Sequence, residues 1–393
     1  MSSLPAERIA VVDVLRAVAL FGIVITHAEM GFLAGPPPAQ DFMRFGAVDV
    51  AVHDWVAILV ESKFFSIFSF LFGLSFAIQL DRARQRGVGF SGRFAWRLTL
   101  LFLIGMAHQL LFNGDILMIY AVLGLLLIPL GKVRTGVLLA VALLLVLNAP
   151  ALVQGLVRVA APPPASEQKQ ASAKLGEIFT VGGQALYAAT KSGSIADIAR
   201  VNYTHGLEMK WVFQWFSGRL WITFGCFLLG LCAGRAGVFR ESDSSRRFFG
   251  RLLAIAGGLA FASSVLVMTF RPSSPLTGVL LQFVSNLQKV SLAAAYLSAI
   301  TLVFWNHPRG MLLQLAPLGR MGLTTYLMQS VFLAAVFYGI GFGLMGRIGS
   351  AAAAAVGAAI FVLQGFIARG WLARMSMGPV EWLWRSATGR SGG

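Results

Sequence analysis

The sequence predicts an all-α fold, a polytopic bundle of transmembrane helices with about ten spans. Of the 393 residues, 57% are hydrophobic and only 12% are charged, whereas about a quarter of the residues of a soluble domain are charged. The mean hydropathy is +0.75. About ten apolar runs approach or exceed the roughly 20 residues that a helix needs to cross a bilayer. Residues 1–393 are therefore expected to form a single transmembrane domain.

The formal net charge of +16 comes mostly from arginines in short segments between the apolar runs. Short arginine-rich loops stay in the cytoplasm, so the charge pattern predicts a topology with both termini cytoplasmic. We therefore attribute the charge to topology, and expect no nucleic-acid partner. The two cysteines, Cys226 and Cys232, share one apolar run and offer neither a disulfide framework nor the spacing of metal ligands. No metal site is expected.

The first five expected spans cover residues 15–34, 64–80, 98–112, 116–131 and 137–157. The second ends in the segment DRARQR, which is expected to lie in the cytoplasm and sets the topology. The third and fourth are joined by Asn113-Gly114-Asp115, where a glycine and an aspartate suit a tight turn that caps the next helix. Lys132 and Arg134 bring the chain back to the cytoplasmic side.

The last five expected spans cover residues 211–234, 252–270, 276–305, a run that contains 320–330, and 351–371. Residues 160–210 form the long polar stretch between the fifth and sixth spans. This stretch is expected to be an extracytoplasmic loop that carries short helices or a lid, because it exceeds an ordinary connection. Residues 375–393 are expected to be an interfacial tail on the cytoplasmic face.

Three ionisable residues interrupt the first span. On a helix that turns about 100° per residue, Arg16 and His27 fall within roughly 20° of each other, and Asp13 lies about 40° from His27. Charged groups inside a membrane usually face a protein interior or a water-filled cavity. The stripe therefore predicts one wall of a polar cavity. The alternative is an ion pair between Asp13 and Arg16 at the helix start, with His27 as a packing residue.

The other polar residues of the spans sort by depth. The outer group contains His27, Glu61, Lys63, Asn113, Asp115 and Arg219, the middle group His108, Asn286, Lys289 and Gln329, and the inner group Asp13, Arg16, Arg97, Arg320 and Glu381. In the eighth span, Gln282, Asn286 and Lys289 share one helical face, and Lys289 is hard to explain as a packing residue. Several of these residues also have a purely structural explanation: Asp115 as a helix cap, Glu61 and Lys63 as an interfacial ion pair, His108 as a packing residue and Arg320 as a cytoplasmic anchor.

Several segments resemble the YeiB family of bacterial membrane proteins, which is of the domain-of-unknown-function 418 type. The resemblance begins with DVLRAVALFGIVITH at residues 13–27. It continues with FSIFSFLFG at 65–73, GDILMIY at 114–120, GRL at 218–220, LGLCAGR at 229–235, GRMGLTTYLMQS at 319–330 and GPVEWLWR at 378–385. It covers nearly the whole chain and implies a multi-pass protein of the bacterial cytoplasmic (inner) membrane.

The opening motif is also similar to that of the transmembrane acyltransferase superfamily, which includes the lysosomal heparan glucosaminide acetyltransferase and the O-antigen and peptidoglycan O-acetyltransferases. This resemblance implies an acyl-CoA donor, acetyl-CoA foremost, that enters from the cytoplasm. It also implies a histidine near the acceptor, and His27 matches the position of that histidine on the first helix. The implied acceptor is a hydroxyl or amine on the far side, such as that of a glycan or a lipid.

A mechanism follows from these expectations. Arginine suits phosphate oxygens, so the CoA phosphates are expected at Arg16, Arg97 and Arg320, with the remaining donor contacts from Lys289, Tyr326 and Gln329. Imidazole ordinarily titrates near neutral pH, so His27 is expected to be the best general base. Either Asp115 or Glu61 is expected to orient it. Stabilisation of the oxyanion is expected from Asn113 or Lys289.

Two other functions remain open from the sequence. In a transporter or flippase for a small anionic or lipid-linked molecule, the polar stripe would be the path and Lys289 the substrate or proton site. A scaffold without turnover is the third possibility. The small residues at 351–355 allow close helix approach and are a candidate homodimer face.

Overall fold

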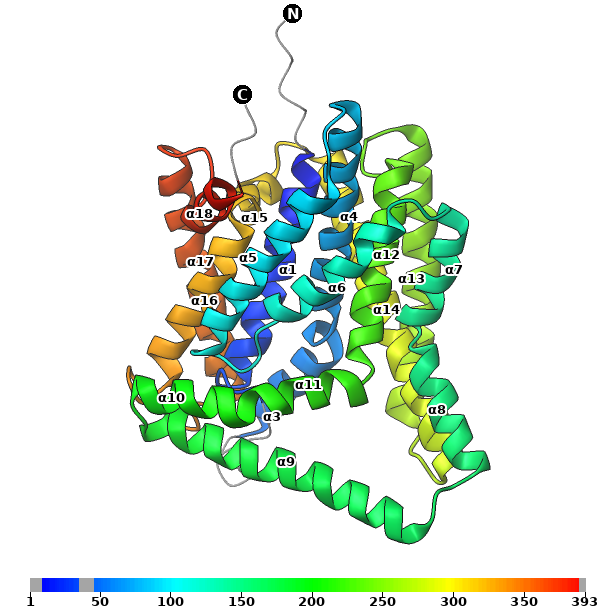
Figure 1. Ribbon diagram of the computed structural model, residues 1–393, viewed down its shortest axis with the longest axis vertical. Coiled ribbons are helices and arrows are strands. Elements are labelled where there is room, and N and C mark those ends of the chain that lie inside the picture. Colours follow the sequence, from blue (N-terminus) through cyan, green and yellow to red (C-terminus); the bar gives the residue numbers. More distant parts are fainter. Residues whose placement is uncertain (1–8, 35–45, 389–393) are drawn as a thin grey trace, which may run out of the picture.

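The computed structural model describes residues 9–34 and 46–388, and all regular secondary structure in this part of the chain is helical (Figure 1). Six helical stretches are long and apolar enough to cross a membrane. They are α1 (Ala10–Glu29), the stretch Ala47–Gln85 that contains α3 and α4, α12 (Arg219–Ala236), α13 (Asp243–Thr269), α14 (Pro275–Asn306) and α17 (Ser350–Leu372). The prediction of an all-α polytopic membrane protein is confirmed.

All ten predicted spans correspond to helices, although not all of them pass the length and hydropathy test. The bent pair α7 (Thr135–Val146) and α8 (Ala149–Ala160) passes only as a single span. The apolar helices α6 (Leu117–Leu130) and α16 (Gly322–Phe337) have 14 and 16 residues, fewer than the roughly 20 of an ordinary span. The count of ten spans stays a prediction.

Three of the predicted spans are divided in the structure. The ninth is interrupted at Met321, which separates a short helix that ends at Arg320 from α16. The fifth bends by 52° between α7 and α8, where Asn148 has a left-handed backbone with φ 57°. The sixth is broken at Ser217 and Gly218, which separate α11 (Leu207–Phe216) from α12. Gly218 also has a positive φ of 69°, a conformation that glycine adopts without steric cost. The prediction of one continuous helix over 211–234 was therefore wrong at this point.

The bundle has two distinct ends. The end that carries the start of α1, the end of α4 (Lys63–Gln85), the connection from α12 to α13, and α18 (Pro379–Ala387) is called here the arginine-rich end; it is uppermost in Figure 1. The opposite end, where α1 finishes, is called the His27 end. The predicted cytoplasmic position of the termini stays a prediction, because residues 1–8 and 389–393 lie outside the described residues.

The long polar stretch forms helices that close the His27 end. In Figure 1, α9 (Ala165–Ser192) lies across the bottom of the bundle, with α10 (Ile195–Val201) and α11 above it. A single π-helical turn, η2 (Asn202–Gly206), joins α10 to α11. Residues 160–210 are thus a helical cover, with one helix much longer than the short ones expected.

Helix α1 runs through the middle of the bundle and contacts α4, α15 (Ala316–Arg320), α16 and α17. Most of its residues are buried. The backbones of α1 and α15 touch: a Cβ atom added to Gly319 would lie 1.8 Å from the carbonyl oxygen of Asp13. Helices α4 and α12 are equally close where Gly73 faces Gly230. The stripe on α1 therefore faces the interior of the bundle, as the cost of charge in a membrane requires.

The remaining helices complete the two ends. They are α3 (Ala47–Trp55), η1 (Val56–Val60), α5 (Ser91–Gln109) and η3 (Met311–Leu315). The predicted tail folds as α18 on the arginine-rich end. The Glu381 carboxylate accepts hydrogen bonds from the backbone N–H groups of Leu323 and Thr324, at 2.7 and 3.0 Å, and so caps α16. Trp384 donates its indole N–H to the carbonyl oxygen of Arg97.

Candidate functional site

A cavity of about 650 Å³ lies at the His27 end and is called here the His27 cavity. Its wall comes from the second half of α1, η1, the start of α4, the turn before α6, α11 and the start of α12. The ionisable and polar side chains that line it include His27, Glu29, His53, Glu61, Asn113, Lys210, Arg219 and Tyr326. Its size is that of a pocket for a small organic molecule.

His27 stands in this cavity at the end of α1. Its ring packs against Phe112, with the ring centroids 5.0 Å apart, and lies 6.1 Å from the Phe32 ring. The side chain makes no hydrogen bond to another residue that the structure describes. Both imidazole nitrogens are therefore available to a molecule in the cavity, which a general base needs.

Opposite charges line the same cavity at Glu61 and Arg219. The Arg219 guanidinium lies over the Phe65 ring, 4.0 Å from its centroid, a distance at which cation–π attraction holds it in place. Its Nε atom is buried and has no partner within residues 9–34 and 46–388. Lys63, by contrast, donates to the carbonyl oxygen of Ala57 at 2.9 Å. The cavity can thus present a fixed cation to a negatively charged group.

Asn113 lines the cavity but is also tied to the backbone. Its Nδ2 donates to the carbonyl oxygen of Ala34 at 2.6 Å, and its Oδ1 accepts from the Ala34 N–H at 3.3 Å. These two bonds fix the turn before α6 against the end of α1. The second Nδ2 proton is the one that remains for a ligand.

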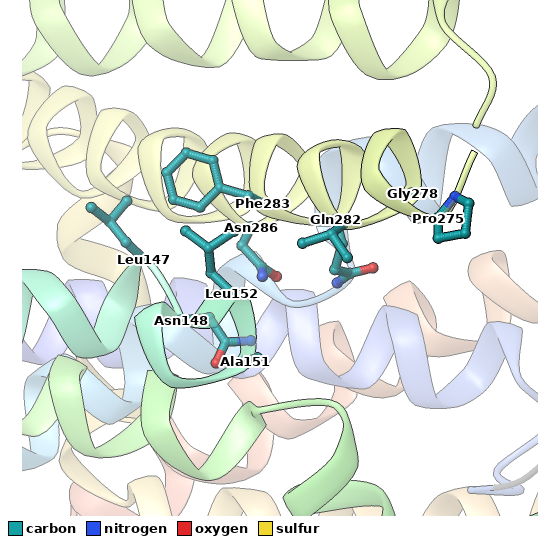
Figure 2. Close-up of a pocket in the computed structure, with 10 residues that line it drawn as sticks. Leu147, Asn148, Ala151, Leu152, Pro275, Gly278, Gln282, Phe283 and Asn286 are labelled. Carbon is teal, nitrogen blue, oxygen red and sulfur yellow. The ribbon is translucent and has the colours of Figure 1, made fainter. Parts of the chain in front are cut away.

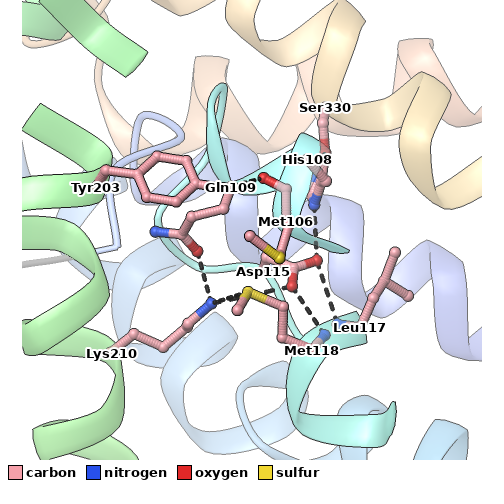
Figure 3. Close-up of polar contacts among 9 residues, drawn as sticks. All are labelled: Met106, His108, Gln109, Asp115, Leu117, Met118, Tyr203, Lys210 and Ser330. Carbon is pink, nitrogen blue, oxygen red and sulfur yellow. Dashed lines mark hydrogen bonds and ion pairs between the residues drawn. The ribbon is translucent and has the colours of Figure 1, made fainter. Parts of the chain in front are cut away.

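Asp115 was expected to orient His27, but its carboxylate contacts His108 instead (Figure 3). His108 Nδ1 lies 2.8 Å from Asp115 Oδ1, and His108 Nε2 lies 2.7 Å from Ser330 Oγ. Asp115 also accepts from the N–H groups of Leu117 and Met118 and so caps α6. The three residues form a buried network that joins α5, α6 and α16 beside the cavity.

Lys210 completes this network from α11, outside the candidate spans. Its ammonium donates to Gln109 Oε1 at 2.6 Å and lies 4.0 Å from Asp115 Oδ2 (Figure 3). Burial lowers the pKa of Lys210 to about 8, while the nearby Asp115 carboxylate acts in the opposite direction. The carboxylate therefore has a cation, a histidine and two backbone N–H groups as partners.

The Asp115→Ala variant is expected to lose about 3–5 kcal/mol of stability, the usual cost of removing one partner of a buried pair. The loss arises because Lys210 and His108 stay buried without the carboxylate and the start of α6 loses its cap. Thermal unfolding of the detergent-purified protein measures the effect. Asp115→Asn keeps a side-chain acceptor for the N–H groups and should lose less. An Ala variant as stable as the wild type would contradict this account.

The structure places two of the three predicted phosphate-binding arginines in one polar chain at the arginine-rich end. Arg16 donates to Asp13 at 2.8 Å and to Ser75 Oγ at 2.7 Å. Arg97 donates to Gln79 Oε1 at 2.6 Å, and Gln79 lies one turn along α4 from Ser75.

The third arginine, Arg320, lies on α15 and donates to the carbonyl oxygen of Ser376. The Nε atoms of Arg97 and Arg320 are buried without a partner in the described part of the chain. The arginine-rich end thus keeps hydrogen-bond donors that its own side chains do not use.

The other three residues predicted for the donor site are not brought together. Tyr326 lines the His27 cavity, with its ring 5.2 Å from that of His108, and its buried hydroxyl has no partner in the described chain. Gln329 donates to the carbonyl oxygen of Leu20 at 3.1 Å. Lys289 is half-buried on α14 and does not line the cavity.

Two groups of residues at the site were not predicted. Glu29 Oε1 lies 2.8 Å from His53 Nδ1 and accepts from Ser350 Oγ at 2.7 Å, which joins α1, α3 and α17. Lys210 and Ser330 enter the network around Asp115. The available signals were weak: Glu29 follows His27 by two residues, Ser330 ends a family motif, and Lys210 lies at the edge of the long polar stretch.

Comparisons with known proteins agree with the predicted family. Residues 233–391 match the family described as "Protein of unknown function (DUF418)". The chain is 29% identical to "Uncharacterized protein YxaH" of Bacillus subtilis (strain 168), over 98% of this chain and 95% of that protein. It is 27% identical to "Uncharacterized protein YeiB" of Escherichia coli (strain K12), over 98% of both chains. No solved structure matches.

The two relatives cover the His27 end as well as the C-terminal part that the family description matches. The resemblance seen in the sequence motifs is therefore confirmed over nearly the full length. The helical architecture and the bacterial homologues together indicate a multi-pass membrane protein. The chain is thus similar over nearly its whole length to the uncharacterized proteins YxaH and YeiB, and its C-terminal part, residues 233–391, matches the DUF418 family.

Proposed function

We propose that this protein is a membrane-bound acyltransferase. It takes an acyl group from acyl-CoA at the arginine-rich end and delivers it to a hydroxyl or amine acceptor in the His27 cavity. One observation carries the proposal: the His27 cavity and the arginines occupy the two ends of the same stripe on α1. Gly22, which lines the cavity, and Arg16 are six residues apart, about 9 Å along the helix axis. A pantetheine arm can bridge a gap of this size.

The cavity also extends toward the arginine-rich end along α16. Tyr326 lines it, and Tyr326 lies four residues, about 6 Å of helix rise, from the first residue of α16. The cap of that helix end is Glu381, on the same surface as Arg97 and Arg320. In the proposal these two arginines and Arg16 bind the CoA phosphates, because guanidinium groups match phosphate oxygens in charge and geometry.

The proposed chemistry uses groups that line the cavity. His27 removes the proton from the acceptor hydroxyl or amine, whose oxygen or nitrogen attacks the thioester carbonyl. The carbon–sulfur bond breaks, the acyl group stays on the acceptor, and the CoA thiolate leaves and is protonated from His27. The Asn113 amide and the Arg219 guanidinium stabilise the oxyanion of the intermediate. Lys289 has no part in this step, because it does not line the cavity.

The buried charges also favour a second function, that of a transporter or flippase for an anionic or lipid-linked molecule. Its specific support is the half-buried Lys289 at mid-span, since an ionisable residue at that depth commonly marks a substrate path. The two functions differ in one measurable respect. A transferase consumes the thioester, and a transporter leaves every ligand chemically unchanged.

The deciding experiment is the binding and turnover of acyl-CoA by the purified protein. Acetyl-CoA, octanoyl-CoA and palmitoyl-CoA are titrated calorimetrically, and the release of free CoA is followed with a thiol reagent. Binding followed by slow release of CoA is expected, because water replaces the missing acceptor. A folded protein that binds none of the three would exclude the acyltransferase and leave the transporter.

The Arg97→Gln variant is expected to weaken acyl-CoA binding about 10–100-fold, the range for a lost charged hydrogen bond. Arg347→Gln is the matched control, because Arg347 is exposed and distant from α5 and α18 in sequence. Both variants carry the same loss of charge. Equal affinities for the two would show that the CoA phosphates do not bind at Arg97.

A further inference from the structure

A second cavity, of about 290 Å³, lies between α8 and α14 (Figure 2). It is called here the lateral groove, and it shares no lining residue with the His27 cavity. It extends from Pro275, where α14 begins, to Asn286, eleven residues further on, which is about 16 Å along the helix axis. The groove therefore reaches from one end of the bundle well into the depth of the membrane.

The bend between α7 and α8 creates the groove. Asn148 adopts a left-handed conformation there, and the chain turns by 52°. As a result, α8 contacts α14 near the first residues of α14. Gly155 of α8 packs against Val279 of α14, where a Cβ atom would lie 2.9 Å from the valine side chain. The space above this contact, on the side of the bend, is lined by Leu147, Ala151, Leu152 and Phe283.

Three amide side chains interrupt this apolar lining, from Asn148, Gln282 and Asn286 (Figure 2). Asn148 is 1% exposed, and its Nδ2 reaches the carbonyl oxygen of Ser217 at 3.4 Å. Its Oδ1 is buried without a partner in the described residues, and the amide packs against Gly218 in the connection between α11 and α12. Asn286 is 4% exposed and makes no hydrogen bond within the same part of the chain. An unsatisfied polar group is costly away from water, so the Asn286 amide, which lines the groove, is expected to bind a ligand.

The surface on either side of the groove is apolar. On α8, Val153 and Val157 are each 58% exposed, and on α14, Leu276 and Leu280 are exposed. In a bilayer, lipid chains cover such a face. The molecule that reaches the groove most directly is therefore a lipid that slides in from the side.

We propose that the lateral groove binds the glycerol region of an uncharged, hydroxyl-bearing membrane lipid of the diacylglycerol type. Two features select this chemistry. The groove has no charged side chain in its lining, so nothing compensates a phosphate. The Asn286 amide makes no hydrogen bond in the described residues and requires a donor as well as an acceptor, and a lipid hydroxyl supplies the donor whereas an ester does not. The ester carbonyls accept from Asn286 and Gln282, and the acyl chains lie along α8 and α14.

The volume agrees with this assignment. About 290 Å³ is at the small end of ligand pockets, enough for the glycerol and its ester groups and too small for whole acyl chains. The apolar faces of α8 and α14 carry the rest of the lipid. The assignment does not depend on acyl transfer, and it holds equally if the His27 cavity serves transport.

The test is native mass spectrometry of the full-length protein released from detergent. Dioleoylglycerol and dioleoyl phosphatidylglycerol are the two probes, added at equal concentration. Retention of dioleoylglycerol in preference to the anionic lipid is expected. Retention of phosphatidylglycerol instead, or equal retention of both, would overturn the proposal, because charge would then not be excluded.

Two kinds of variant locate the binding. The double variant Gln282→Leu/Asn286→Leu should retain dioleoylglycerol at least about ten-fold less, since two hydrogen bonds are lost. Gly278→Leu fills the groove and keeps every amide; only Pro272 lies within 4 Å of a Cβ atom there, at 3.8 Å, so the helix tolerates the change. It should abolish retention even if the double variant fails to fold.

The matched control is Gln288→Leu. It removes an amide from the same helix, but Gln288 donates to the carbonyl oxygen of Ile58 and lies outside the groove. Retention by this variant should equal that of the wild type. If Gly278→Leu also retains the lipid as well as the wild type does, the lipid binds elsewhere and the proposal is wrong.

Discussion

The His27→Ala variant is expected to lose acyl transfer by about 10²–10⁴-fold, the usual contribution of a general acid–base group. No other imidazole in the described residues stands free in the His27 cavity: His53 is bonded to Glu29, and His108 is bonded to Asp115 and Ser330. The variant should still fold, because His27 makes no hydrogen bond to the described residues. Thiol release from acetyl-CoA and thermal unfolding are measured together.

Measurement of acyl-CoA binding distinguishes a catalytic role of His27 from a purely structural one. The affinity for acyl-CoA should stay unchanged in His27→Ala, since the proposed phosphate contacts lie at the other end of the α1 stripe. His307→Ala is the control, an exposed histidine at the arginine-rich end, and should turn over at the wild-type rate. A His27→Ala protein that retains full turnover would remove the general base from the mechanism.

The second large effect is expected at the crossing of α4 and α12. A Cβ atom at Gly73 would lie 1.9 Å from the carbonyl oxygen of Phe227, and one at Gly230 would lie 2.0 Å from that of Phe70. Both obstacles are backbone atoms of the partner helix, which cannot rotate aside. Gly73→Ala should therefore cost about 3 kcal/mol, the upper part of the range for overpacking, and Gly73→Leu should prevent folding.

The control for this effect lies on α13. Gly257 has nothing within 4 Å of a Cβ atom, so Gly257→Ala should be neutral or more stable by up to about 1 kcal/mol, from helix propensity alone. The yield of monodisperse protein and its unfolding temperature give the comparison. If both Ala variants unfold at the same temperature, the two backbones are not in the contact described.

The stripe on α1 was predictable because helix geometry fixes it. Eleven residues make about three turns, so Arg16 and His27 share a side whatever surrounds them. Helix geometry does not say what this side faces. In the structure it faces the His27 cavity at one end, and at the other end it faces arginines that are hydrogen-bonded to side chains of α1 and α4. Each end includes residues more than fifty positions away, such as Asn113 and Arg219 in the cavity and Ser75 beside Arg16.

The partner of Asp115 was not predictable from the same reasoning. Its position before an apolar run predicted a helix cap, and the structure contains that cap. The expectation that it also orients His27 rested on both residues lying at the same depth. The turn before α6 instead brings back the end of its own preceding helix, so the carboxylate meets His108. The order by depth placed His108 in the middle group and His27 beside Asp115 in the outer group, so it favoured the wrong histidine.

The breaks at Asn148 and Gly218 escaped prediction for a related reason. Each follows or precedes a run apolar enough to continue as a helix, and hydropathy does not register a single left-handed residue. Asn and Gly are the residues that adopt this conformation most readily. The lateral groove results directly from the break at Asn148, so it could not be predicted from the sequence either.

The close contact between α1 and α15 has a consequence for the order of biosynthesis. Gly319, whose backbone lies on that of Asp13, is made about 300 residues after it, which at 5–20 residues per second is about 15–60 s later. During that time α1 lies in the membrane with Arg16 and His27, but the helices that later pack around these residues have not been made. The first helix to enter the membrane is thus among the last to complete its packing contacts. A truncated chain that stops before α15 should therefore be recognised as incomplete by the quality-control proteases of the cell.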